Sequence, residues 1–186
     1  MTAAPRRNKK SRIPQAERRA DVVEAALVEF GKRGFDGTTT SMIAERAGIQ
    51  QPYIYALFEN KRHLFLACQE TLYSRMLEIF ENAVEEKDSP HERLRKMGIA
   101  YLQLLDDDAW VQCHLQVLAA SGHPELRDQI RQSFIGAFRK IEEITGADPP
   151  QVSRFFAAGT LLNALSAMDA PAEMIEPLRV PREDEL

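Results

Sequence analysis

A helix, a tight turn and a second short helix are predicted within residues 34–65, and they restrict the fold more than any other segment. There the sequence reads GFDGTTTSMIAERAGIQQPYIYALFENKRHLF, with Gly48 between two short apolar-faced stretches and Asn60 before a third. Glycine readily adopts the left-handed conformation in which helices end, and Pro52 suits a first helical turn because its missing N–H is not needed there. The spacing predicts a helix-turn-helix.

Apolar residues recur at helical spacing along most of the chain. With Gly31 and Gly34 expected to end the first helix, this periodicity predicts helices at about residues 15–32, 40–47, 51–57, 61–87, 91–106, 109–121, 124–145 and 150–168. The predicted fold class is all-α. A three-helix helix-turn-helix domain of residues 15–75 is joined by a long helix to a larger helical domain of residues 76–186.

Charge is unevenly distributed along the chain. The net charge is −4, but residues 1–62 hold 12 Lys/Arg against 7 Asp/Glu, whereas residues 63–186 hold 12 against 21. Residues 1–14 contain no acid, and their basic side chains are Arg6, Arg7, Lys9, Lys10 and Arg12. This basic arm is predicted to be disordered, either as a solvated tail or as an arm that follows DNA phosphates or enters a minor groove. The imbalance indicates a polyanionic partner at one end only.

Catalytic and metal-binding patterns are missing from the sequence. We find no Ser/His/Asp arrangement, no phosphate-binding glycine loop and no metal-ligand spacing. The histidines are isolated from one another: His63, His91, His114 and His123. Cys68 and Cys113 are expected to be reduced thiols because no signal peptide is evident, and no apolar run is long enough to span a membrane. We therefore expect a cytoplasmic protein that is not an enzyme and has no cofactor or metal.

The run IAERAGIQQPYIYALFENKRHL, residues 43–64, resembles the tetracycline-repressor-like (TetR) family of bacterial transcriptional regulators. The preceding AALVEFGKRGFDGTTT also fits that family, and the resemblance covers about residues 15–70. It implies that contacts with DNA bases or phosphates come from Thr40, Ser41, Gln50, Gln51, Pro52, Tyr53, Tyr55 and Lys61. The chain departs from common family residues at Ser41, Gln50 and Tyr53, so the resemblance implies no particular operator sequence.

Four of these side chains also suit DNA contact on physical grounds. Gln51 on the outer face of a recognition helix can pair with the N6 and N7 atoms of adenine, and Tyr53 can pack on a sugar or a thymine methyl group. Tyr55 is interpreted either as a core aromatic residue or as a ring whose hydroxyl reaches a phosphate. Lys61 begins a helix, where its charge and the free amides attract phosphate. The alternative for each exposed side chain is plain solvation.

An uncharged stretch near the C-terminal end indicates a dimer. Residues 155–168 read FFAAGTLLNALSAM and contain no charged side chain. A helix that is apolar nearly all round is buried on two sides, one against its own core and the other against a second copy. The predicted interface residues are Phe155, Gly159, Leu162 and Ser166. A twofold dimer would read a near-palindromic operator. The alternative is the central helix of a monomer.

Bulky and polar residues in the larger domain predict a cavity for a small molecule. The predicted lining residues are Tyr101, Trp110, Cys113, His114, Phe134, Phe138 and Asn163. A ligand cavity needs apolar walls and a few convergent polar groups, which this set supplies. The alternative is that these aromatic residues are ordinary core. The identity of the effector does not follow from these residues.

Together with the resemblance, these patterns predict a ligand-responsive DNA-binding transcriptional regulator. It is expected to bind a near-palindromic operator as a homodimer, to repress, as the family tends to do, and to be released by a small-molecule effector. It would be cytoplasmic, and associated with the nucleoid when bound to DNA. The alternative is a helical interaction module that uses the helix-turn-helix for protein contacts.

Overall fold

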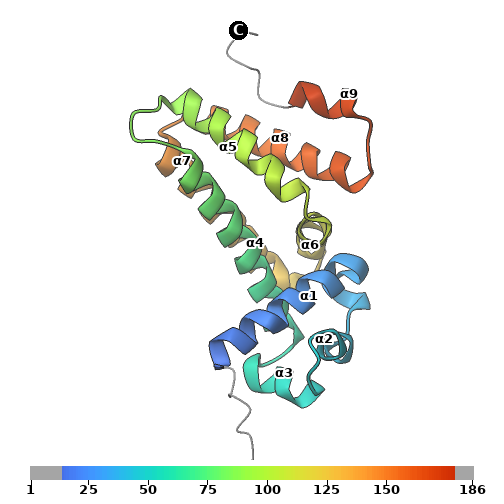
Figure 1. Ribbon diagram of the computed structural model, residues 1–186. Coiled ribbons are helices and arrows are strands. Elements are labelled where there is room, and N and C mark those ends of the chain that lie inside the picture. The colour runs from blue at the N-terminus through green and yellow to red at the C-terminus, as the bar shows by residue number, and fades with distance from the viewer. Residues whose placement is uncertain (1–13, 179–186) are drawn as a thin grey trace, which may run out of the picture.

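The computed structural model describes residues 14–178, which form helices without a β-strand (Figure 1). The elements are α1 (Gln15–Gly37), α2 (Thr40–Arg46), α3 (Gln51–Leu57), α4 (Lys61–Ala83), α5 (Pro90–Leu105), α6 (Asp108–Ala119), the 3₁₀ turn η1 (Ala120–Gly122), α7 (Pro124–Thr145), α8 (Pro149–Ala167), α9 (Ala172–Ile175) and the 3₁₀ turn η2 (Glu176–Leu178). The all-α prediction is confirmed. Within this described part, no helix combines the length and apolar character that a bilayer crossing requires. Residues 1–13 of the predicted basic arm lie outside the described residues.

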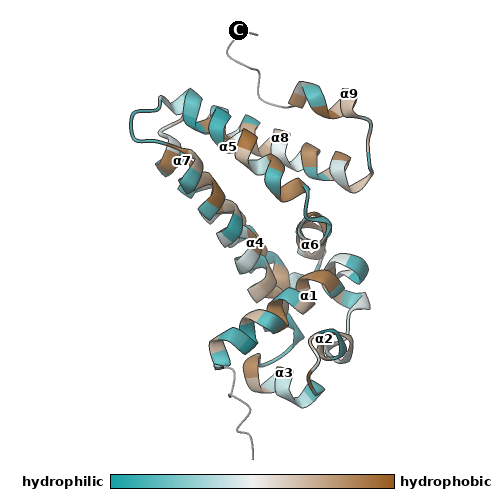
Figure 2. Ribbon diagram, viewed as in Figure 1, coloured by the Kyte–Doolittle hydropathy of each residue, from teal (hydrophilic) through white to brown (hydrophobic). Residues whose placement is uncertain are grey.

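Helix α4 connects the two ends of the molecule. In Figure 1 the helices α1, α2 and α3 gather at the foot, and α4 rises from them beside α7 toward α5 and α8. Helix α6 lies between α1 and α8 and packs against both. The predicted domain boundary after residue 75 therefore falls inside α4, which belongs to both parts. Figure 2 shows hydrophobic and hydrophilic residues alternating along α4 and α5, as amphipathic helices require.

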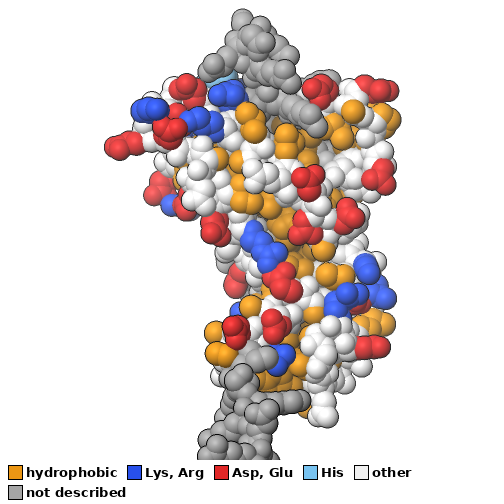
Figure 3. Space-filling model, in the orientation of Figure 1, with side chains coloured by type: hydrophobic (Ala, Val, Ile, Leu, Met, Phe, Trp, Pro, Cys, Tyr) orange, Lys and Arg blue, Asp and Glu red, His pale blue; other side chains and the backbone are white. Residues whose placement is uncertain are grey.

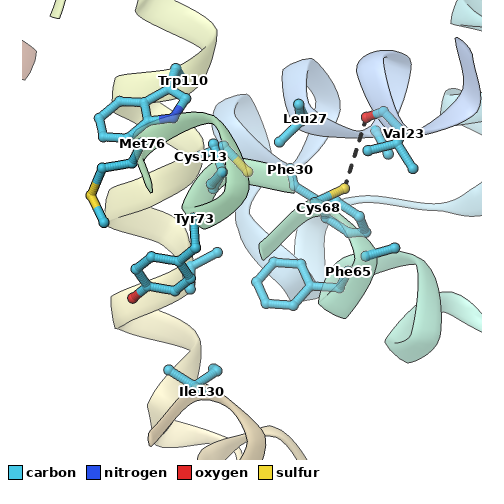
Figure 4. Close-up of a cluster of buried hydrophobic side chains, with 14 of the residues drawn as sticks. Val23, Leu27, Phe30, Phe65, Cys68, Tyr73, Met76, Trp110, Cys113 and Ile130 are labelled. Atoms are coloured by element: carbon cyan, nitrogen blue, oxygen red, sulfur yellow. Dashed lines mark hydrogen bonds between the residues drawn. The ribbon is translucent and has the colours of Figure 1, made fainter. Parts of the chain in front are cut away.

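One hydrophobic core runs through both parts of the molecule. The ring of Phe30 in α1 lies edge-on to that of Phe65 in α4, with centroids 4.9 Å apart. Figure 4 shows the cluster continuing past Cys68 and Cys113 to Trp110 in α6. Burial raises the pKa of both thiols, so they stay protonated at neutral pH. The three-helix foot is thus packed onto the larger part without a solvent layer.

Side-chain caps account for the starts of α2 and α4. The hydroxyl of Thr39 accepts a hydrogen bond from the N–H of Met42 at 3.3 Å, and the side-chain oxygen of Asn60 accepts one from His63 at 3.0 Å. Such caps satisfy first-turn amides that have no partner inside the helix. The turn between α2 and α3 passes through Gly48, whose φ of 63° is left-handed as the sequence predicts.

Regular helical geometry in α1 breaks at Gly34, close to the end that the sequence predicts near residue 32. Helix α1 continues to Gly37 across a kink at Gly34, where φ is 68° and ψ is −177°. The hydroxyl of Thr38 donates to the carbonyl oxygens of Gly34 at 2.8 Å and Glu29 at 2.9 Å, which holds the kinked segment against the helix. Thr38 and Glu29 are nine residues apart, so rules based on neighbouring residues in a helix do not predict the hydrogen bond between them.

Helix α4 is shorter than the sequence predicts, ending at Ala83 instead of near residue 87. The carboxylate of Asp88 accepts a hydrogen bond from the N–H of Glu85 at 2.7 Å and receives the ammonium group of Lys96 at 2.8 Å. These contacts stabilise a turn in place of the last helical residues, and they lower the pKa of Asp88.

We expect Gly34→Ala to destabilise the protein more than Gly48→Ala. The backbone of Gly34 occupies a region that only glycine populates, at a cost to other residues of roughly 1–3 kcal/mol, and a Cβ there would lie 2.8 Å from the Oε1 atom of Gln116. Gly48 has ordinary left-handed angles with no atom within 4 Å of a Cβ, so its substitution costs about 1 kcal/mol. Urea unfolding of both variants measures the difference. Equal losses would contradict the account of the kink.

Candidate functional site

Helix α3 presents one face to the core and the other to solvent. Ile54 is fully buried and Phe58 nearly so, as the sequence predicts. The side chains on the opposite face are therefore turned outward: Tyr53 is 42% exposed and Tyr55 is 52% exposed. The remaining predicted contact positions Ser41, Gln50 and Pro52, as well as Gln51 itself, are also exposed. The helix-turn-helix thus offers a continuous polar and aromatic surface.

A hydrogen-bond network joins three of the predicted DNA-contact residues. The Nε2 atom of Gln51 donates to the hydroxyl of Thr40 at 2.8 Å, and the hydroxyls of Thr40 and Tyr55 lie 3.0 Å apart. Thr40 is only 5% exposed. It lies beneath the two larger side chains and orients them, which differs from the direct contact that the resemblance implies for it.

The ammonium group of Lys61 is engaged inside the protein. It donates to the carbonyl oxygens of Phe35 at 2.8 Å and Thr38 at 3.2 Å, and it lies 4.5 Å from the centre of the Phe35 ring. These contacts attach the start of α4 to the kinked end of α1. A phosphate contact by Lys61, as predicted, would require the ammonium group to leave both carbonyls.

The sequence interpretation overlooked a buried acid beneath α2. Glu29 is 5% exposed and receives Arg46 at 2.6 Å and also Arg33. A buried carboxylate must be paired, so this cluster ties α2 to α1 and holds the side chain of Arg46 at the edge of the exposed surface. The signal was present in the sequence, since Glu29 falls at helical spacing among the apolar residues Val22 and Ala26.

A cavity of about 280 Å³ lies among α4, α5, α6, α7, α8 and η2. Four of the predicted lining residues do line it, namely Tyr101, His114, Phe134 and Asn163. The sequence interpretation missed the contribution of α4, which supplies Tyr73, Met76 and Phe80. Those three positions share one helix face at spacings of three and four residues, which is also the pattern of plain core.

Three predicted lining residues do not reach the cavity. Trp110 is buried behind Tyr101 and His114, with ring centroids at 5.7 and 5.0 Å. Cys113 is buried on the side of α6 that meets α1. Phe138 packs on Phe156 at 5.3 Å. Helical periodicity identifies these residues as apolar positions, but the neighbours of each helix decide which of them face empty space.

The four residues predicted for the dimer interface face other parts of the same chain. Phe155, Gly159 and Leu162 line the cavity, and the hydroxyl of Ser166 donates to a carbonyl oxygen of α5 at 3.5 Å. The outward face of α8 carries Leu161 instead, which is 47% exposed. Because residues 155–168 contain no charge, the sequence pattern offers nothing to distinguish the two faces.

The deeper polar groups of the cavity are uncharged at neutral pH. Burial lowers the pKa of His114 to about 4, so its imidazole is neutral. Burial also raises the pKa of Tyr73 to about 12 and that of Tyr101 further. The side-chain nitrogen of Asn163 donates to the hydroxyl of Tyr101, which orients both groups.

We expect His114→Phe to flatten the acid side of the stability profile. The folded pKa of about 4 lies below the unfolded value of about 6.5, so the unfolded chain takes up the proton and stability is lost as the pH falls. Between pH 8 and pH 5 the wild type should lose about 2 kcal/mol more than the variant, measured by urea unfolding. Exposed His91→Gln serves as the control. An unchanged pH dependence in His114→Phe would contradict the assignment.

The comparisons with known proteins agree with this geometry. Residues 22–68 match the family described as bacterial regulatory proteins, tetR family. The chain is 47% identical over 51 residues to the tetracycline repressor protein class A from transposon 1721 of Escherichia coli. The aligned residues make up 27% of this chain and 24% of that protein. It is 28% identical over 99 residues to the HTH-type transcriptional activator FasR of Mycolicibacterium smegmatis. This alignment covers 53% of this chain and 45% of that protein.

The chain thus spans about half or less of the length of these curated relatives. Its fold also resembles the crystal structure of the transcriptional regulator FadR from Bacillus subtilis in complex with stearoyl-CoA. The TM-score is 0.68 at 19% sequence identity, over 87% of this chain and 99% of that one, so the likeness is one of fold. Residues 22–68, which contain the helix-turn-helix, are thus similar to the tetR family of bacterial regulatory proteins.

Proposed function

We propose that this protein is a DNA-binding transcriptional regulator that acts as a homodimer and responds to a small molecule held in the cavity. The observation that carries the proposal is the exposed face of α3, where Gln51 and Tyr55 are held over the buried hydroxyl of Thr40. Side chains oriented before binding lose less conformational entropy on contact with DNA. The match of residues 22–68 to the tetR family supports the same function.

Charge favours one docking orientation on DNA. In Figure 3 acidic side chains are visible over the upper part of the molecule, which contains α5, α8 and α9, together with some basic ones, and acidic side chains are visible over the lower part as well. Residues 63–186 carry 21 Asp/Glu against 12 Lys/Arg. Phosphates would repel that part, so the proposal has α3 entering the major groove while the rest of the protein faces away. Gln51 and Tyr53 would then meet base edges, and Tyr55 would reach a phosphate.

A second copy is proposed to bind along α7 and α8. Their outward faces expose Ile135 and Leu161, at 42% and 47%. A short recognition helix reads few base pairs, and a twofold dimer doubles the site by placing two such helices on a near-palindrome. The proposed interface uses the side of α8 opposite to the cavity.

The cavity and the recognition helix share a rigid element. Helix α4 follows α3 after a connection of three residues and supplies Tyr73, Met76 and Phe80 to the cavity wall. Helix α6 lines the cavity with His114 and packs against α1. A ligand that prefers one placement of α4 and α6 would change the spacing of the two recognition helices, and a preference of about 1–3 kcal/mol is typical.

The effector is proposed to have an apolar body. When it binds, the protein is proposed to act as a repressor that leaves its operator in the cytoplasm. The aromatic walls of the cavity support the apolar body. So does the stearoyl-CoA complex of the Bacillus subtilis regulator that shares the fold. One relative is named a repressor and another an activator. A reporter gene placed behind the selected operator therefore tests the sign.

Selection from random duplex DNA tests the function. We expect an enriched near-palindrome whose affinity falls steeply with salt, because bound Lys and Arg release counterions from phosphates. Gln51→Ala should weaken binding by about 5- to 150-fold and relax the preference at one base position of each half-site. Exposed Gln103→Ala on α5 should leave binding unchanged. No enrichment and a flat salt response would indicate protein contacts instead.

The proposed interface has a matched test. Leu161→Glu puts a charge into the contact and should convert the dimer to a monomer in sedimentation experiments, because an unpaired buried charge is strongly unfavourable. Ile99→Glu is the control, since Ile99 on α5 is 50% exposed and lies outside the proposed contact. A dimer that survives Leu161→Glu would place the interface elsewhere.

A further inference from the structure

The inner end of the cavity is formed by four polar side chains, none of which is charged at neutral pH. Tyr73, Tyr101, His114 and Asn163 all line the cavity and all are buried. The opposite end includes exposed residues such as Ile99, Thr160 and Glu176. Between them lie the apolar walls, where the rings of Phe80 and Phe155 meet at 5.5 Å. The cavity is therefore deep, apolar along its length and polar at its closed end.

Two atoms at the closed end lack a hydrogen-bond partner within the described residues. Asn163 is fully buried; its nitrogen donates to Tyr101, but its Oδ1 atom accepts from no group there. The hydroxyl of Tyr73 is likewise buried without a partner in the described part of the chain. Buried polar groups in folded proteins are almost always satisfied, so these two atoms indicate a missing partner. A carboxamide oxygen can only accept, so the partner of Asn163 must donate.

A charged partner does not fit this end of the cavity. The imidazole of His114 is neutral, and it is surrounded by the rings of Trp110 and Tyr73 at 5.0 and 6.0 Å. A carboxylate here would lose its hydration with no cation from residues 14–178 beside it, and it would also present an acceptor to the acceptor atom of Asn163. The cation that does line the cavity, Arg95, is six residues from Tyr101 along α5, or about 9 Å.

We propose that the cavity binds an uncharged amphipathic molecule, such as an alkyl or aryl alcohol or a primary amide. Its polar group enters first and donates a hydrogen bond to the Oδ1 atom of Asn163. The hydroxyl of Tyr73 pairs with the same group, and the apolar body lies against the rings of Phe80 and Phe155. The inference names the effector class for the proposed function and rests on it for the link to DNA, but the binding chemistry can be measured without DNA.

A set of ligands that differ only in the head group tests this chemistry. The probes are 1-octanol, octanamide, 1-methoxyoctane and octanoate, titrated by calorimetry into the full chain at pH 8, where octanoate is ionised. We expect the alcohol and the amide to bind at least about tenfold more tightly than the ether and the acid, because a site built to pair with a donor rejects analogues that lack it. The ether keeps the acceptor oxygen and replaces the donor hydrogen with a methyl group.

Substitutions at the closed end assign the preference to the named atoms. Asn163→Leu removes the acceptor and should make the alcohol and the ether bind alike. Tyr73→Phe removes a single oxygen atom and should reduce the preference by severalfold, which keeps the test open if Asn163→Leu does not fold. The matched control is Thr160→Val, because the hydroxyl of Thr160 lines the cavity but donates to the carbonyl of Phe156 at 2.9 Å. That variant should keep the preference.

Several outcomes would overturn the inference. Tighter binding of octanoate would place a charged head group in the cavity, and equal binding of the ether would mean that the amide of Asn163 presents its nitrogen. Absence of binding by all four probes would also overturn it. Failure of the proposed function is a separate result: it would appear as absence of operator selection while the alcohol preference persists. A binding preference for the alcohol, together with release of the operator by 1-octanol, would support both the inferred ligand class and the proposed function.

Discussion

Helix α1 packs against α4 and α6 at once, and through this packing the two ends of the molecule are held in one arrangement. Phe30 is fully buried and meets the ring of Phe65 edge-on at 4.9 Å. On the other side Gly31 lets α6 approach closely, because a Cβ there would lie 3.2 Å from the backbone nitrogen of Cys113. Interiors packed this tightly do not deform continuously, so a ligand that moves α4 or α6 must move α1 with them or leave the protein unchanged. The proposed regulation depends on this contact more than on any property of the recognition helix.

Polar contacts supplement the few apolar side chains that the two short helices of the helix-turn-helix bury. Helices α2 and α3 contain seven residues each, and α3 buries only Ile54 within its span. Glu29 binds Arg46 from beneath, Thr40 joins Gln51 to Tyr55, and Lys61 closes the turn after α1. Each of these contacts joins residues that are more than ten positions apart. They give the exposed face a defined shape before any DNA is present, which lowers the entropy lost on binding.

Helix α8 is a wall of the cavity on one side and an exposed apolar surface on the other. Phe155, Gly159 and Leu162 face inward, whereas Leu161 faces out. The absence of charge predicts that this helix is buried, but it does not indicate which of its faces meets which neighbour. The same applies inside the cavity, where Trp110 is hidden behind Tyr101 and Tyr73 is open to the space. For α8 and for the cavity alike, the sequence indicated apolar positions, but it did not indicate which neighbours these positions face.

Rules that act over a few residues were enough to predict the helical class, the cap at Asn60, the left-handed Gly48 and the outward side of α3 with Gln51 and Tyr53. Those features follow from backbone geometry and periodicity, which any short segment carries with it. The pairing of Glu29 with Arg46, the use of Lys61 and the unpartnered oxygen of Asn163 needed the tertiary structure. Each depends on which faces of separate helices meet, and that is decided by packing the whole core, since a helix pattern specifies a face but not the neighbour that covers it.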